Sequence, residues 1–158
     1  NESNVLLFYL SIYALMNIAV FIFIDTLEAS LGSTSIESYK GLGKQFPVLF
    51  TSFSLVLIAL IGLPPTAGFV GKLLIFSKVF EQYQSFQSFG LLALLIVGAL
   101  TSVISLFYYF KIPLNAFLKD SMDQYTHKSN PLLLGIGLLC TVLVILLGLF
   151  PDILLSVF

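Results

Sequence analysis

The chain has 158 residues, of which 58% are hydrophobic and only 9% are charged, and its formal net charge is −1. Soluble domains carry about 25% charged residues, so this composition, with a mean hydropathy of +1.05, indicates an integral membrane protein. The charge gives no sign of a nucleic-acid partner, and the single cysteine, Cys140, allows neither an internal disulfide nor a metal site with two thiols.

Four apolar segments predict an all-α fold, a polytopic transmembrane helix bundle. A spanning helix needs about 20 apolar residues, and three segments fit one crossing each, at about residues 5–24, 89–110 and 132–150. The chain begins at Asn1 without a basic stretch followed by a short apolar core. We therefore expect no signal peptide and interpret residues 1–158 as one transmembrane region of a longer protein.

The second apolar segment, from residue 47 to residue 77, is too long for one straight crossing and too short for two. A straight helix over it would be about 46 Å long, against a hydrocarbon core of about 30 Å, and two crossings need about 40 residues. Pro64 and Pro65 lack backbone donors, and Leu63 before them is pushed toward an extended conformation. We predict one crossing over about 47–83, broken at 62–65 into half-helices 47–61 and 66–83, with Thr66 in the N-cap region of the second half. The bundle would then have four spans, the second of them discontinuous.

Lysines in the connections predict the orientation. With four crossings, connections 25–46 and 111–130 lie on one side and carry five lysines, against one lysine, Lys78, on the other. The five are Lys40, Lys44, Lys111, Lys119 and Lys128. By the positive-inside rule their side faces the cytoplasm, and both ends of the chain face outward. We expect a multi-pass protein of the inner (cytoplasmic) cell membrane.

Lys72, within the second segment, is the main candidate for chemistry. A charge in hydrocarbon costs roughly 2.5–3.5 kcal/mol on insertion scales. Desolvation disfavours the charged form of a buried lysine, so Lys72 could accept and release a proton as a relay group. The alternative is a snorkelling lysine, which we consider weaker because the nearest charged residues, Lys78 and Glu81, lie beyond comfortable reach along the helix.

Four residues next to Lys72 form the predicted helix break: Gly62, Pro64, Pro65 and Gly68. A broken backbone at membrane depth is tolerated only inside protein or beside a water-filled cavity. A plain proline kink is the alternative, and the nearby lysine favours a functional break. Gly68 and Gly71 leave room for water or for a close backbone.

Other polar residues are weaker candidates. Gly98, Ser102, Ser105 and Tyr109 share one helical face, which favours packing between helices over a hydrated channel wall. The candidate channel wall would comprise Thr66, Ser102, Ser105 and Tyr109. Tyr108, Tyr109 and Lys111 resemble an interfacial belt. Tyr13 and Asn17 share a face and favour packing, and solvated loop positions are expected for Asp25, Glu28, Glu37 and His127. No catalytic residue, phosphate loop or cluster of metal ligands is recognisable.

Residues 60–72 read LIGLPPTAGFVGK and resemble the hallmark of subunit N (subunit 2) of proton-pumping NADH:quinone oxidoreductase, respiratory complex I, in the antiporter-like membrane subunit family. Three further stretches are similar in order to that family. Residues 7–10 and 17–21 resemble its eleventh helix, residues 37–43 the following cytoplasmic loop, and residues 105–111 the end of its thirteenth helix. The resemblance covers nearly the whole chain.

The resemblance implies that the chain is the C-terminal part of a subunit of fourteen helices that contains two inverted repeats, each with a discontinuous helix. Lys72 then matches the lysine of the discontinuous twelfth helix, a proposed proton-relay residue of the membrane arm. The family's glutamate on helix five and its lysines on helices seven and eight are absent from these residues. This part alone should therefore not pump protons.

The function implied is a membrane-arm subunit that takes part in proton translocation, coupled to quinone reduction by other subunits. NADH, FMN, iron–sulfur clusters and quinone would bind those other subunits, so no cofactor or metal is expected in this chain. The expected partners are the other membrane-arm subunits and the lipid bilayer. Two alternatives stay open: a subunit of a multi-subunit cation/proton antiporter, and a structural membrane bundle in which the lysine and prolines serve packing.

Overall fold

The computed structural model describes residues 2–120, 125 and 130–156, and every regular element in that part of the chain is a helix. The predicted all-α class is confirmed. The long helices are α1 (Glu2–Leu31), α3 (Pro47–Ile61), α4 (Ala67–Phe86), α5 (Phe89–Leu118) and α6 (Pro131–Leu149). The short ones are the 3-10 helix η1 (Ile36–Tyr39), α2 (Leu42–Gln45) and α7 (Asp152–Leu155).

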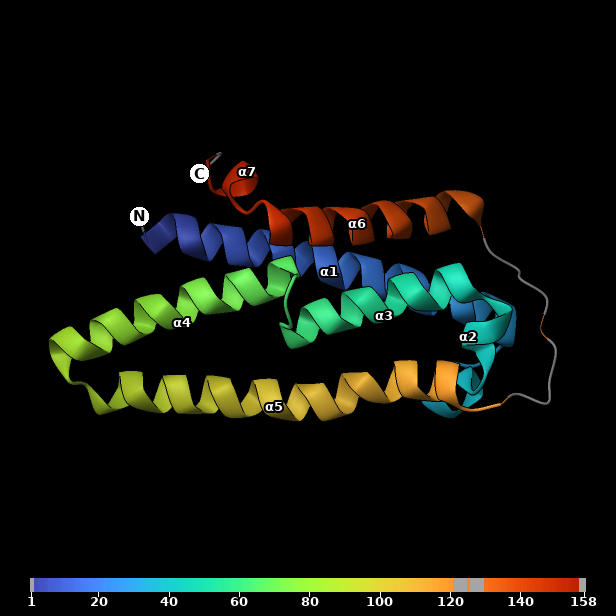
Figure 1. Cartoon of the computed structure of the whole chain (residues 1–158), viewed down its shortest axis with the longest axis horizontal. Coiled ribbons are helices and arrows are strands. Elements are labelled where there is room, and N and C mark those ends of the chain that lie inside the picture. Colours follow the sequence, from blue (N-terminus) through green and yellow to red (C-terminus); the bar gives the residue numbers. More distant parts are fainter. Residues whose placement is uncertain (1, 121–124, 126–129, 157–158) are drawn as a thin grey trace.

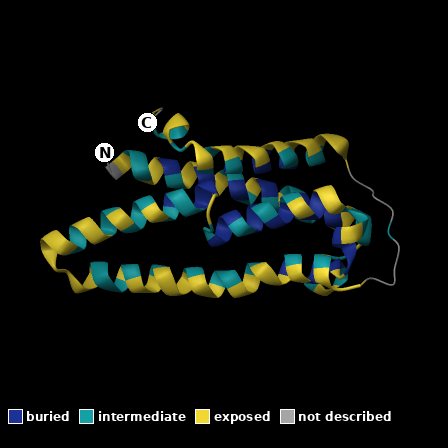
Figure 2. Ribbon diagram, in the orientation of Figure 1, coloured by how far each residue is buried: buried dark blue, intermediate teal, exposed yellow. Residues whose placement is uncertain are grey.

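Helices α3 and α4 run end to end through the middle of the molecule (Figure 1). Helix α5 lies along one side of this pair, and α1 and α6 lie along the other. Helix α1 packs against α3, α4 and α6, and buried side chains concentrate on α1 and α3 (Figure 2). We call the end that carries η1, α2 and the last turns of α1 and α5 the loop end. The start of α1 and the short α7 lie at the opposite end (Figure 1).

Helix α1 contains the predicted span 5–24 but continues to Leu31. Asp25 and Glu28, predicted to lie in a connection, are therefore helical, and that prediction was wrong. A single acidic residue does not end a helix, and neither proline nor glycine occurs before Gly32. Gly32 has a φ of 68°, and its N–H donates to the Glu28 carbonyl at 2.8 Å, a left-handed ending that suits glycine.

Helix α5 contains the predicted span 89–110 and continues past it, through Pro113. The proline removes one backbone donor, but contacts at the loop end hold the additional turns in place. Gly41 N–H donates to the Asn115 carbonyl at 3.1 Å, and the buried Asn115 amide donates to the Ile36 carbonyl at 3.4 Å. Lys111 is consequently part of α5, and the prediction that it begins a connection was wrong.

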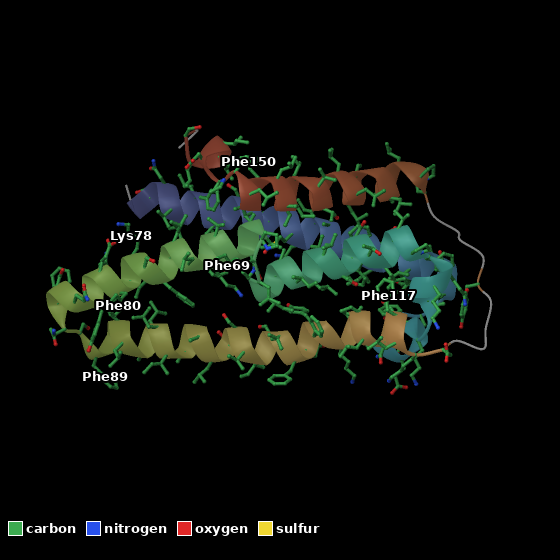
Figure 3. The ribbon with its side chains drawn as sticks, viewed as in Figure 1. Phe69, Lys78, Phe80, Phe89, Phe117 and Phe150 are labelled. Carbon is green, nitrogen blue, oxygen red and sulfur yellow. The ribbon has the colours of Figure 1, made fainter. Side chains whose placement is uncertain are left out.

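An ion pair and an aromatic contact close the loop end. Lys44 of α2 and Asp120 after α5 approach to 2.7 Å, with both side chains exposed. The hydrogen bond and the charge of Lys44 hold the pKa of the Asp120 carboxyl below its usual range. Phe117 lies against α2 (Figure 3), where Gly43 leaves room for its ring. The solvated position predicted for His127 lies outside the described residues, as does Lys128.

Among the described residues, three helices are long and apolar enough to cross a membrane, judged by length and composition: α1, α5 and α6. Helix α5 exposes large apolar side chains, with Phe107 75% exposed. Helix α3 is apolar but has only 15 residues. Helix α4 has 20 residues and carries Lys72, Lys78 and Glu81, which lowers its hydropathy.

Candidate functional site

The backbone leaves helical geometry at Gly62, directly after α3. Gly62 has a φ of 89°, in the left-handed region that glycine adopts without steric cost. Its N–H donates to the Ala59 and Ile58 carbonyls at 3.0 and 3.1 Å. Pro64 and Pro65 carry no N–H and cannot continue the helical ladder. The last carbonyls of α3 are therefore open to donors from elsewhere.

Helix α4 begins close to the end of α3. Thr66 is its N-cap residue, but the hydroxyl does not cap the helix. Instead, Thr66 Oγ1 donates to the Leu63 carbonyl at 2.7 Å, within the break. Gly68 lies so near α3 that a Cβ there would overlap the Ala59 carbonyl oxygen. The small residue thus permits the close approach of the two helix ends.

Lys72 reaches back from α4 to the end of α3. Its Nζ donates to the Ile61 carbonyl at 2.7 Å and to the Leu60 carbonyl at 3.0 Å. Both acceptors belong to the last turn of α3, where the helix dipole is negative. A Cβ on Gly62 would lie only 2.8 Å from Lys72 Cδ. The missing side chain at Gly62 therefore leaves space for the lysine stem, and the ammonium lies at the helix break.

A cavity of about 300 Å³ lies beside Lys72, between α1, α4, α5 and the end of α3. Liquid water occupies about 30 Å³ per molecule, so the space is large enough for several waters. Among the described residues of the lining, Lys72 is the one charged side chain. The polar side chains around it are Tyr9, Tyr13, Thr101, Ser102, Ser105 and Tyr109.

The structure brings only part of the predicted site together. Ser102, Ser105 and Tyr109 line the same cavity as Lys72, although they come from a different helix, and Gly68 lines it too. Thr66, of the candidate channel wall, is not among the lining residues, and neither are Gly62, Pro64 and Pro65 of the predicted break.

Hydroxyl groups on the cavity face of α5 bond within their own helix. Ser102 and Thr101 donate to the Gly98 carbonyl at 2.9 and 3.0 Å, and Ser105 donates to the Thr101 carbonyl at 2.7 Å. Serine and threonine in helices commonly satisfy their hydroxyls on a preceding turn in this way. These bonds do not join helices, so the predicted packing role rests on side-chain size and not on hydrogen bonding between helices.

Asn17 behaves in the same way. Its Nδ2 donates to the Tyr13 carbonyl of its own helix at 2.7 Å, and Asn17 is not part of the cavity lining. Tyr13 does line the cavity and stacks on Tyr9, with ring centroids 6.0 Å apart. Tyr13 and Asn17, predicted to share one face, therefore differ in their surroundings. Tyr13 lines the cavity, whereas Asn17 makes a hydrogen bond within its own helix.

Sequence reasoning missed several lining residues, among them Tyr9, Met16 and Phe76. Tyr9, Tyr13 and Met16 follow spacings of four and three, which place them on one helical face. That pattern was visible in the sequence but did not show which neighbour the face contacts. Phe76 lies on α4 one turn after Lys72, and its ring packs against Gly98.

Gly148 near the end of α6 supports the break from the other side. A Cβ there would overlap the Pro65 carbonyl oxygen and the backbone of Thr66 and Ala67. Helix α6 therefore packs directly on the non-helical residues. A glycine in an apolar run gave no sequence signal for this contact, because the partner lies more than eighty residues earlier.

The described residues contain no group of three or more His, Cys, Asp or Glu side chains that could hold a metal ion. Cys140 is buried in α6. The described lining of the cavity combines the ammonium of Lys72 with hydroxyl groups of serine, threonine and tyrosine side chains, all of which can form hydrogen bonds to water.

The comparisons with known proteins all point to one family. Residues 2–105 match the family described as NADH:quinone oxidoreductase/Mrp antiporter, TM. The chain is 43% identical over 138 residues to NADH-quinone oxidoreductase subunit N 2 of Chloroherpeton thalassium, covering 87% of this chain and 25% of that protein. It is 42% identical over 118 residues to NADH-quinone oxidoreductase subunit N of Chlorobium chlorochromatii, covering 75% and 22%.

A solved structure is also similar. A chain in respiratory complex I from Thermus thermophilus with bound aureothin superposes with a TM-score of 0.76 at 29% identity. The alignment covers 97% of this chain and 34% of that one. The chain thus spans about a quarter to a third of the length of these relatives. The resemblance to subunit N that the sequence motif predicted is confirmed.

Proposed function

We propose, because this chain belongs to the NADH:quinone oxidoreductase/Mrp antiporter transmembrane family, that it forms part of a membrane-arm subunit N of NADH:quinone oxidoreductase in which Lys72 relays protons. The observation that carries the proposal is the place of Lys72. It is the one charged side chain among the described residues that line the cavity, and its ammonium lies at the helix break. Electron transfer from NADH to quinone would be carried out by other subunits.

The surroundings of Lys72 both stabilise and disfavour its charged form, as expected of a group that gains and loses a proton. Two carbonyl acceptors and the negative end of the α3 dipole stabilise the ammonium. Partial burial in an apolar bundle disfavours the same charge. A nearby charge that appears or disappears during turnover would therefore tip the balance between the protonated and neutral forms. Water in the cavity would supply and remove the proton.

Helices α3 and α4 would together form one interrupted crossing. With 15 residues, α3 is about 22 Å long, shorter than the hydrocarbon core of about 30 Å. The two helices run end to end in the same direction beside α5 (Figure 1). With α1, α5 and α6 this makes four spans, the second discontinuous, in one transmembrane region over residues 1–158. That region would be the C-terminal part of a larger antiporter-like subunit.

The lysines at the loop end support an orientation of the bundle across the membrane. Lys40, Lys44 and Lys119 lie at or beside η1, α2 and the end of α5, so this end would face the cytoplasm. The protein would then lie in the inner (cytoplasmic) membrane, with lipid and other membrane-arm subunits as its neighbours. NADH, FMN, iron–sulfur clusters and quinone would be bound by other subunits, with no cofactor or metal held by this chain.

The test replaces Lys72 with alanine in the full-length subunit of the assembled complex. NADH:quinone reductase activity and proton pumping are measured in membrane vesicles, together with the amount of assembled complex. We expect normal assembly and a strong loss of pumping. Lys78→Ala is the matched control, because Lys78 lies on the same helix but is exposed and paired with Glu81 at 2.6 Å. Unchanged pumping in Lys72→Ala would show that Lys72 is not a relay.

The same experiment separates the alternatives. The family description covers Mrp antiporters as well, and sodium-dependent flux without NADH oxidation would favour a multi-subunit cation/proton antiporter. A structural role predicts that Lys72→Met assembles poorly, while the complex that does assemble pumps normally.

A further inference from the structure

A second cavity of about 230 Å³ lies at the loop end, next to the cavity of Lys72. It is lined by residues of α1, α3, α5 and η1 and by Thr34 between α1 and η1, and most of its lining is apolar. Tyr109 of α5 belongs to the lining of both cavities. Its side chain is partly buried and packs against the hydrophobic core. The two spaces therefore meet at one aromatic residue.

The two cavities follow one another along the same helix faces. On α5, Ser105 lines the first cavity and Ile112 lines the second, with Tyr109 between them at spacings of four and three. On α1, Met16 lines the first and Val20 the second. Since α1 and α5 both run toward the loop end (Figure 1), the second cavity extends the first in that direction.

The Tyr109 ring is partly buried against the hydrophobic core. It also contacts the ring of its chain neighbour Tyr108, which is 64% exposed, edge to face with centroids 5.8 Å apart and planes at 79°. An aromatic ring that fills the junction interrupts a chain of water molecules, whereas a methyl group would leave space that water can occupy beside polar groups. Ser105, one turn away, provides such a group.

We propose that Tyr109 separates the cavity of Lys72 from the loop-end cavity, so that water and protons pass between Lys72 and the loop side only where the Tyr109 ring yields. Tyr109 is thus a positioning residue, which acts on the hydration of Lys72 from the lining of the same cavity. The consequence for protons rests on the proposed relay function of Lys72, whereas the separation of the two cavities is independent of that function.

The test measures access to the first cavity. Ser102→Cys is introduced as a reporter in a Cys140→Ala background of the full-length subunit in its assembled complex. A small, membrane-impermeant, cationic methanethiosulfonate is added to either side, using right-side-out and inverted vesicles. Tyr109→Ala should raise the labelling rate from the loop side by about tenfold or more, equivalent to about 1.4 kcal/mol less barrier to entry. Tyr109→Phe, which keeps the ring, should label at the original rate.

Tyr108→Ala is the matched control, because Tyr108 lines the second cavity but not the first. It should leave the labelling rate at position 102 unchanged. Equal labelling in Tyr109→Ala and the parent, or an equal rise in Tyr108→Ala, would overturn the proposal. If Tyr109→Ala does not assemble, Tyr109→Leu makes the same comparison with a smaller side chain. Labelling does not depend on pumping, so a failure of the Lys72 relay would be seen separately.

Discussion

Replacing Gly62 with alanine tests whether the helix break exists to receive Lys72. The substitution does two things at once. It places a side chain on a residue with a φ of 89°, and it puts a Cβ 2.8 Å from Lys72 Cδ and 3.4 Å from Lys72 Nζ. Backbone strain and displacement of the lysine must therefore be separated.

Gly32 offers the matched control. Its φ is 68°, also left-handed, but a Cβ there would meet nothing within 4 Å. The left-handed conformation costs an L-residue about 1–2 kcal/mol, and this cost is common to both alanine variants. In Gly62→Ala the lysine stem must also move. A hydrogen bond to a charged group contributes about 1.5–3 kcal/mol, so losing one of the two Lys72 bonds adds roughly that amount beyond Gly32→Ala.

The assay compares both variants in the assembled complex, by thermal stability and by the number of protons pumped per NADH oxidised. We expect Gly62→Ala to lower thermal stability more than Gly32→Ala and to reduce pumping, while Gly32→Ala pumps normally. In a Lys72→Met background the additional penalty of Gly62→Ala should shrink toward that of Gly32→Ala, because residues in contact are energetically coupled. Equal losses in the two glycine variants, with pumping retained in both, would refute the reasoning.

Two further predictions concern packing and surface charge. Gly148→Ala should lower the melting temperature of the complex, because its Cβ would overlap the Pro65 carbonyl, whereas Gly135→Ala on the same helix, with nothing within 4 Å, should not; equal melting temperatures would contradict the packing. Lys44→Ala should leave the melting temperature at neutral pH almost unchanged, since exposed ion pairs contribute little. Lys44 holds the pKa of Asp120 low. Any contribution of this ion pair to stability is therefore present above the ordinary pKa of an aspartate and is lost as the pH falls through the lowered value. A stabilising effect of Lys44 that appears only at acid pH would contradict this sign.

Proline and glycine residues made some helix boundaries predictable from the sequence. The predicted half-helix 47–61 coincides with α3, because Pro47 suits a first helical turn and Gly62 with the two prolines cannot continue the ladder. The start of α6 at Pro131, next to the predicted start at 132, has the same origin. Proline and glycine act through their own φ angles, so their effect needs no knowledge of neighbouring helices.

The sequence placed the C-terminal ends of α1 and α5 too early. The predicted first span ends at about residue 24, with a connection from Asp25 onward, although α1 continues to Leu31. The predicted span 89–110 stopped before Lys111, but α5 continues to Leu118, and Asn115 in its last turns is buried and bonded to the loop end. At the end of α5, contacts with distant residues outweighed the local signal. At the end of α1, no helix-breaking residue occurs before Gly32.

The sequence by itself determined that this is an apolar helical bundle, where one of its segments is interrupted, and that a lysine follows the interruption. Those properties depend on segment length, on the φ restrictions of proline and glycine, and on composition, all of which can be read from the sequence without knowing which segments pack together. Only the tertiary structure decided what surrounds Lys72. The Ile61 carbonyl lies eleven residues before it and the serines of α5 thirty or more residues after it. They meet because α3, α4 and α5 pack together, and no local pattern specifies that packing.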